Sequence, residues 1–79
     1  AKQNSYFAQL ELGRMYWIGR GTPKNLVKAY AWANISSAEG GQESVGVRNV
    51  IAKELSQKQI IEAQNYSREC VKTNFENCD

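Results

Sequence analysis

The chain has 79 residues, which is enough for one small domain and too few for a second independent hydrophobic core. With 42% hydrophobic and 23% charged residues, its composition is that of a folded globular chain and argues against intrinsic disorder. The net charge of +2, from ten basic and eight acidic residues, gives little support for binding to nucleic acid or anionic lipid.

Membrane insertion is not expected, because no apolar run approaches the roughly 18 residues that a spanning helix needs. The chain also begins without a basic and then apolar secretory leader. Residues 1–5 read as a cut inside a longer sequence at least as well as a natural start. The missing leader therefore carries no weight in assigning a compartment.

The first predicted helix covers residues 5–18 and is apolar on nearly all sides. On a helical wheel its apolar residues form three groups: Ala8, Leu12, Met15 and Tyr16; Tyr6, Leu10, Gly13 and Trp17; and Phe7 with Ile18. A helix of this kind is buried on most sides, and 79 residues provide too little chain to cover it. The pattern predicts that a preceding repeat or another molecule covers this helix.

A turn over residues 19–24 ends the first helix, because its glycines permit a left-handed backbone and Pro23 stops the helix. Asn25 is the expected N-cap of a second helix that runs to about Glu39. The predicted inward stripe of this helix consists mostly of small residues: Leu26, Ala29, Ala33, Ser36 and Ser37. Small residues there, with Gly13 on the first helix, let two helix backbones approach closely. The two serines are expected to bond back to carbonyls one turn earlier.

Two further helices are predicted after Gly40 and Gly41, which end the second one. The third covers about residues 43–55 and has one apolar face: Val47, Val50, Ile51 and Leu55. Ser56 and Gln59 fit a capping box that starts the fourth helix. That helix should fray near residue 73, and one side of it carries Ile60, Ala63, Ser67, Cys70 and Val71. The expected fold is therefore all-α, with four antiparallel helices in two hairpins.

One closely spaced motif runs through the first two predicted helices. Its residues are Ala8, Leu12-Gly13, Tyr16, Gly19-x-Gly21, Lys28-Ala29, Trp32 and Ala38-x-Gly40. This motif resembles the Sel-1-like repeat family, a branch of the tetratricopeptide-like helix-pair repeats. Residues 43–71 are similar to the closing segment that often follows the last repeat in bacterial members. The resemblance implies a short α-solenoid, with one full repeat over residues 5–41 and a C-terminal capping helix pair and tail over residues 42–79.

No catalytic chemistry is indicated by the residue types. The chain has no histidine, which removes serine–histidine and cysteine–histidine nucleophile pairs and the commonest metal ligand. Its carboxylates show no paired acid–base motif, and Glu11 and Arg14 are spaced for a surface ion pair. The turn at residues 19–24 lacks the spacing of a phosphate-binding loop. We therefore expect no enzymatic activity, no cofactor and no metal site.

The two cysteines, Cys70 and Cys78, have neither zinc-ligand nor redox-motif spacing. They can form a disulfide only if the fourth helix ends between them, since eight residues of straight helix would separate them by about 12 Å. Free thiols or bonds to a partner are the alternatives. A disulfide would indicate the bacterial periplasm or secretion, whereas free thiols would indicate the cytoplasm.

The expected function is protein–protein interaction, because the resemblance implies a scaffold that holds other proteins. The predicted partner-binding face lies on the first helix and consists of Tyr6, Gln9, Leu10, Gly13, Arg14 and Trp17. Its partner would be another protein, a neighbouring repeat or a second copy of the chain. The alternatives are a structural C-terminal cap of a longer repeat array and a small inhibitor or immunity-type protein that binds one enzyme or toxin.

Overall fold

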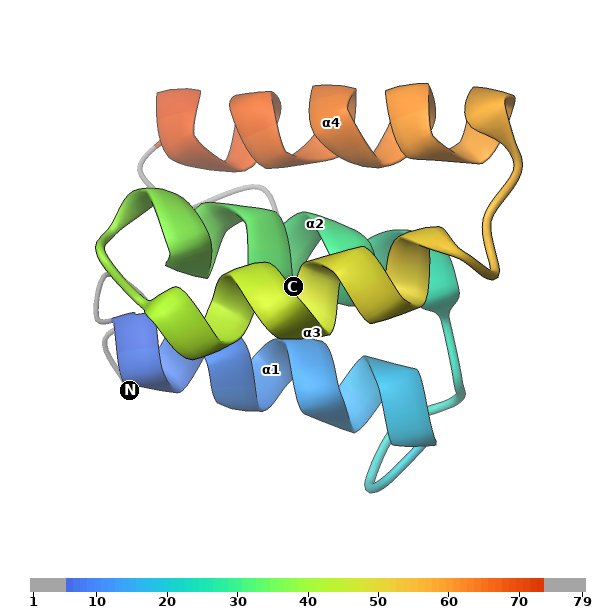
Figure 1. Cartoon of the computed structure of the whole chain (residues 1–79), viewed down its shortest axis with the longest axis horizontal. Coiled ribbons are helices and arrows are strands. Elements are labelled where there is room, and N and C mark those ends of the chain that lie inside the picture. Colours follow the sequence, from blue (N-terminus) through green and yellow to red (C-terminus); the bar gives the residue numbers. More distant parts are fainter. Residues whose placement is uncertain (1–5, 74–79) are drawn as a thin grey trace.

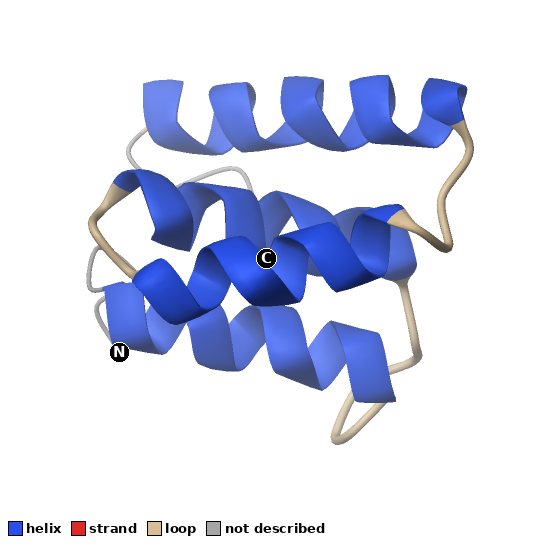
Figure 2. Ribbon diagram, viewed as in Figure 1, coloured by secondary structure: helices blue, strands red, loops and turns tan. Residues whose placement is uncertain are grey.

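The computed structural model describes residues 6–73, in which every secondary-structure element is an α-helix (Figures 1 and 2). The helices are α1 (Tyr6–Ile18), α2 (Leu26–Ala38), α3 (Gln42–Ala52) and α4 (Gln57–Lys72). Successive helices run in alternate directions, which is compatible with two hairpins (Figure 1). The all-α fold class predicted from the sequence is confirmed.

Helix α2 is the centre of the fold and packs against each of the other three helices. Its buried residues cover most of its circumference: Ala29, Tyr30, Ala31, Trp32, Ala33, Ile35 and Ser36. The sequence predicts a first helix that is apolar on nearly all sides and needs a preceding repeat or another molecule to cover it, and within the described residues α1 is covered mainly by α2. The outer side of α1 carries Phe7 and Ile18, which are 65% and 68% exposed. The short alanine side chains of α2 explain the difference, because they let neighbouring helices approach it from several directions.

The close approach of α1 to α2 depends on Gly13. A Cβ at this position would lie 3.2 Å from the carbonyl oxygen of Ala29 and 3.3 Å from the backbone nitrogen of Ala33. Both of these atoms belong to the backbone of α2, so they have little freedom to move away. The predicted close packing of the two helix backbones is confirmed.

Two helices begin at the side-chain caps that the sequence predicts. The side-chain oxygen of Asn25 accepts a hydrogen bond from the backbone N–H of Lys28 at 3.1 Å and caps α2. At the start of α4, the Ser56 hydroxyl accepts from the Gln59 N–H at 3.2 Å. The Gln59 side chain accepts in return from the Ser56 N–H at 2.9 Å. These bonds satisfy backbone donors that a helix N-terminus otherwise leaves open.

Helix α3 ends three residues earlier than predicted, at Ala52. The N–H groups of Glu54 and Leu55 bond to carbonyls three residues back, which tightens the chain into a turn. Leu55 still packs partly buried against the core from this turn. Its side chain thus joins the core as the predicted apolar face of the third helix requires, although its backbone lies beyond the end of α3.

Three helices meet around the buried hydroxyl of Ser36. Its Oγ donates to the backbone carbonyl of Tyr6 at 2.6 Å and lies 2.5 Å from the Oγ of Ser44. A hydroxyl has one proton, so Ser44 donates to Ser36 in this arrangement. The prediction that Ser36 bonds back within its own helix is therefore wrong. Gly41 completes the junction, since a Cβ there would lie 2.8 Å from Ser44 Oγ and from Tyr6 Cδ1.

Lys28 on α2 contacts aromatic rings of both α1 and α4. Its Nζ lies 5.4 Å from the ring centroid of Tyr16 on α1 and 5.9 Å from that of Tyr66 on α4. Both distances are within the range of a cation–π attraction. One ammonium group thus stands between aromatic rings of two helices that pack on α2.

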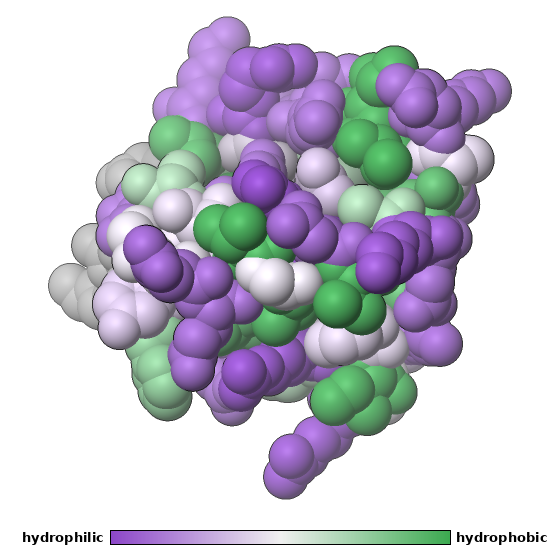
Figure 3. All heavy atoms as spheres, viewed as in Figure 1, coloured by the Kyte–Doolittle hydropathy of each residue, from purple (hydrophilic) through white to green (hydrophobic). Residues whose placement is uncertain are grey.

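The surface in Figure 3 is mostly polar, with apolar side chains scattered among polar ones and near both ends of α1 along the lower edge. The strongly exposed large apolar residues are Tyr6, Phe7, Ile18, Val45, Val50, Ile61 and Val71. None of the helices in residues 6–73 is long and apolar enough to cross a membrane.

Candidate functional site

The six residues of the predicted partner-binding face do not share one surface. Gln9 and Leu10 are 0% and 2% exposed, and Gly13 is buried against α2. The placement of these three on an exposed face is corrected by the structure. The helical wheel of α1 shows three apolar groups, and it does not indicate which group meets the neighbouring helix.

The other three predicted residues have different surroundings. Tyr6 is 46% exposed at the start of α1, and Trp17 is partly buried against the core around Ala29. Arg14 is exposed and forms the expected ion pair with Glu11, with 3.6 Å between nitrogen and oxygen. Tyr6 and Arg14 therefore remain available at the surface for a partner.

The exposed side of α1 is formed by four residues, which we call the outer stripe: Phe7, Glu11, Arg14 and Ile18. A small surface pocket of about 270 Å³ lies beside it. This pocket is lined by Glu11, Arg14, Met15, Ile18 and Arg20. The 4-3-4 spacing of the stripe was a usable signal in the sequence, because residues spaced in this way lie along one side of a helix.

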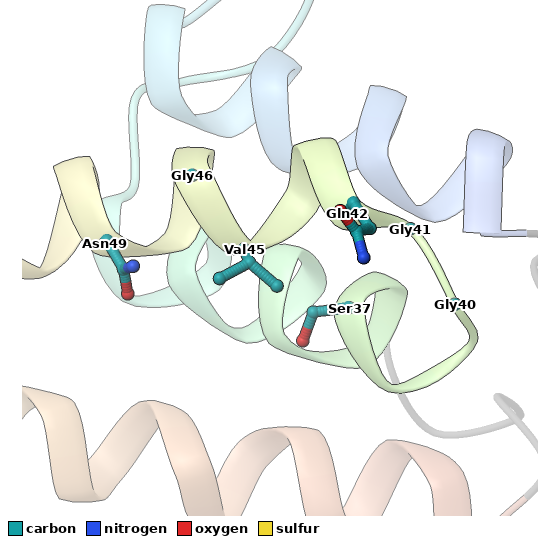
Figure 4. A pocket seen from close by; sticks show the side chains of 7 residues that line it. All are labelled: Ser37, Gly40, Gly41, Gln42, Val45, Gly46 and Asn49. Atoms are coloured by element: carbon teal, nitrogen blue, oxygen red, sulfur yellow. The ribbon is translucent and has the colours of Figure 1, made fainter.

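A second hollow, which we call the α2–α3 pocket, lies between the C-terminal end of α2 and the outer part of α3 (Figure 4). It has a volume of about 450 Å³ and is open to solvent. Its lining residues are Ser37, Gly40, Gly41, Gln42, Val45, Gly46 and Asn49. In Figure 4, the side chains of Val45 and Asn49 lie on the flank of α3 that faces α4, with Ser37 beside them.

A polar network adjoins the α2–α3 pocket and joins three helices. The Arg48 guanidinium on α3 donates from Nη1 to the side-chain oxygen of Asn34 at 3.1 Å and to the Ser37 hydroxyl at 3.4 Å. Asn34 in turn donates to the hydroxyl of Ser67 on α4 at 3.3 Å. The Ser67 hydroxyl donates a hydrogen bond to the backbone carbonyl of Ala63 at 2.8 Å. These hydrogen bonds run in one direction, from Arg48 through Asn34 and Ser67 to the backbone of α4.

Ser37 has a fixed place in the same network. Its hydroxyl donates to the backbone carbonyl of Asn34 at 2.7 Å, as the sequence predicts for a serine within a helix. Because its single proton is used in that bond, the hydroxyl oxygen accepts from Arg48. The network therefore holds the Arg48 guanidinium between two neutral oxygen atoms, and one of them, the Ser37 hydroxyl, belongs to a residue that lines the pocket.

Arg48 is half-buried, and its side-chain partners in the described part of the chain are neutral. The guanidinium has five N–H donors, and its bonds here all leave from Nη1. A carboxylate is the strongest partner for a guanidinium with remaining donors, because the two groups match in charge and in planar geometry. The remaining donors of Arg48 are therefore chemically suited to an anionic or carbonyl group.

Cys70 is buried on α4 beside Trp32 and Ile35. Its predicted partner, Cys78, lies outside the described residues, so the disulfide stays a prediction. Within residues 6–73, no group of three or more metal-ligating side chains comes together.

The network around Arg48 is the part of the site that sequence reasoning missed. Arg48 belongs to the segment that resembles a closing repeat, and Ser67 to the predicted inner side of α4. Neither position indicates that both side chains meet Asn34. Their partners are 14 and 33 residues away along the chain, so no local spacing pattern could have found them.

Comparison with known proteins gives no identification: the chain matches no family model, no curated protein and no solved structure. The Sel-1-like resemblance therefore depends on the motif residues of the sequence itself.

Proposed function

We propose that this chain is a non-catalytic protein-binding module of the Sel-1-like repeat type. In this proposal the α2–α3 pocket, with Arg48 at its edge, binds a segment of a partner protein. The observation that carries the proposal is the position of Arg48, which is held by neutral Asn34 and by Ser37, a residue that lines an open hollow of about 450 Å³. The motif in residues 8–40 supports the same class of function, because the resemblance implies a scaffold.

The chemistry of the pocket favours a partner segment that carries both an acidic and an apolar side chain. A carboxylate of the segment would pair with the remaining donors of Arg48. Val45, which is partly exposed in the pocket lining, would contact the apolar side chain. The Arg48 contact gives orientation and the apolar contact excludes water, as in the anchor regions of protein interfaces.

The direct test is selection of peptides from a random displayed library against the folded chain, followed by affinity measurements with the Arg48→Gln variant. We expect acidic peptides to be enriched, and we expect Arg48→Gln to weaken their binding at least tenfold, because it removes a charge-assisted contact. Lys53→Gln makes the same charge change at an exposed position outside the network and should leave binding unchanged. Equal binding by the chain and the Arg48→Gln variant would rule out this site.

A second variant distinguishes charge pairing from a loss of local structure. Asn34→Asp places a carboxylate within reach of the Arg48 guanidinium and provides an internal partner for it. This internal carboxylate should compete with that of the peptide and weaken binding while the fold stays intact. Circular dichroism of both variants shows whether the helices are preserved.

The polar solvent side of α4 favours a second candidate function, the structural cap of a longer repeat array. That side carries exposed polar residues: Lys58, Glu62, Asn65, Arg68, Glu69 and Lys72. Terminal repeats of solenoids need such a face for solubility. Fusion of a Sel-1-like repeat before α1 should then raise the melting temperature, because the added helices would cover the outer stripe.

A further inference from the structure

We infer that the outer stripe of α1 is a self-complementary surface that pairs two copies of this chain in antiparallel orientation. This surface is on α1, whereas the α2–α3 pocket is lined by residues of α2, of α3 and of the turn between them (Figures 1 and 4). The inference therefore goes beyond the proposed function and stands independently of it.

The spacing of the stripe is that of a coiled-coil seam. Phe7, Glu11, Arg14 and Ile18 follow one another at intervals of four, three and four residues. Intervals of three and four are those of the a and d positions of a heptad, which keep one side of a helix turned toward a partner helix. All four side chains are exposed, so this side of α1 is open to a second helix.

The order of residue types along the stripe is complementary to its own reverse, as a two-fold axis requires. It is apolar, acidic, basic and apolar, with its midpoint between positions 12 and 13. In an antiparallel pair, Phe7 lies opposite Ile18 of the second copy, and Glu11 lies opposite Arg14 of the second copy. Both charged contacts then join opposite signs, and both apolar contacts join large side chains. Two-fold pairing of this kind uses the same patch on both copies.

Charge excludes the parallel alternative. In a parallel pair with the same register, Glu11 would face Glu11 and Arg14 would face Arg14. Like charges opposite each other oppose association, so the central pair selects the antiparallel orientation. In each copy Glu11 and Arg14 already lie 3.6 Å apart. The antiparallel pair therefore brings together four charges of alternating sign.

The pocket beside the stripe offers space for Phe7 of the second copy, which is the largest apolar side chain of the stripe. Three of its four lining residues on α1, which are Arg14, Met15 and Ile18, lie in the C-terminal half of the helix. Antiparallel pairing brings Phe7 of the second copy to this half of α1. By symmetry, the dimer contains two such contacts, and each would cover an exposed phenylalanine.

The dimer should be weak. A single stripe on a helix of 13 residues provides less surface than the roughly 800 Å² per partner of a typical stable complex. We therefore expect a dissociation constant on the order of 0.1 mM. Because exposed charges form the centre of the contact, added salt should weaken the association further.

Charge reversal tests the inference by sedimentation equilibrium. The chain should shift from 8.9 kDa toward twice that mass as its concentration rises. With E11R both charged positions of the stripe are basic, and with R14E both are acidic. Each variant alone should therefore lose self-association. An equimolar mixture of the two should associate again, because every cross-copy contact then joins opposite charges. Restoration in the mixture cannot come from a fold defect in the single variants.

Four outcomes would overturn the inference. A chain that stays monomeric at millimolar concentration has no such dimer, and a mixture that fails to associate has no antiparallel charge pairing. A dimer that survives on a non-reducing denaturing gel is covalent. The Arg48→Gln variant should dimerise as well as the native chain, and its failure to do so would assign the association to the α2–α3 pocket. The combined F7S and I18S variant should remain monomeric in every mixture.

Discussion

The guanidinium of Arg48 donates a hydrogen bond to the side-chain oxygen of Asn34 at 3.1 Å, which joins α3 to the central helix α2. The same Asn34 side chain donates to Ser67 on α4. One amide therefore connects three helices, and each of its two ends has a different partner. This arrangement fixes the distance of α3 and α4 from α2 at the place where the proposed partner segment binds.

Replacement of Asn34 by alanine should destabilise the fold by about 1–2 kcal/mol, because two partly buried polar partners lose their contact. In a domain of this size, such a loss lowers the melting temperature by roughly 4–16 °C. Asn49→Ala is the matched control, since Asn49 is exposed on the outer part of α3. Thermal unfolding followed by circular dichroism gives both values. A similar loss in both variants would show that the Asn34 contacts contribute nothing specific.

The ends of the helices could be predicted from the sequence because their signals are local. A cap and its backbone donor are three residues apart, as with Asn25 and Lys28 or Ser56 and Gln59. Glycines at the turns act through their own backbone, and Gly19 and Gly21 adopt the predicted left-handed conformation, with φ of 82° and 77°. Each of these features is decided by a few neighbouring residues.

The choice of central helix and of binding surface could not be predicted in the same way. Both α1 and α2 have apolar residues on several sides, and their wheels give no preference between them. The decision depends on how closely other helices can approach, which the alanines of α2 permit from several directions. Gln9 and Leu10 are buried for this reason, although the sequence places them on the same predicted face as the exposed Arg14.

The direction of the hydrogen bonds at the α1–α2–α3 junction predicts an unequal pair of serine variants. Ser36→Ala removes the acceptor of the Ser44 hydroxyl and a donor to the Tyr6 carbonyl, and should cost about 1–3 kcal/mol. Ser44→Ala leaves the bond from Ser36 to Tyr6 in place and should cost less. Urea unfolding of the two single variants and the double variant measures the order and the coupling. A larger loss for Ser44→Ala would reverse the assigned direction.

The ammonium of Lys28 should contribute a small, charge-dependent part of the stability. Lys28→Met keeps an unbranched apolar chain between the rings of Tyr16 and Tyr66 and removes the charge. We expect a loss of about 0.5–1 kcal/mol, which is the size of a partly exposed cation–π contact. Lys58→Met, at an exposed position on α4, serves as the control in urea unfolding. An unchanged stability in Lys28→Met would mean that packing alone holds the two rings.

Two glycines, one at the N-cap of α3 and one within this helix, should respond to alanine in opposite directions. A Cβ at Gly41 would lie 2.8 Å from both the Ser44 hydroxyl and the Tyr6 ring, so Gly41→Ala must displace the buried junction. Overpacking of this kind costs about 1–3 kcal/mol. A Cβ at Gly46 meets nothing within 4 Å and lies within the helix, where alanine is favoured over glycine by up to about 1 kcal/mol. Melting temperatures should therefore fall for Gly41→Ala and rise for Gly46→Ala. The same sign for both variants would contradict the close contact of Tyr6 with the α2–α3 turn, since propensity alone cannot separate the two positions in this way.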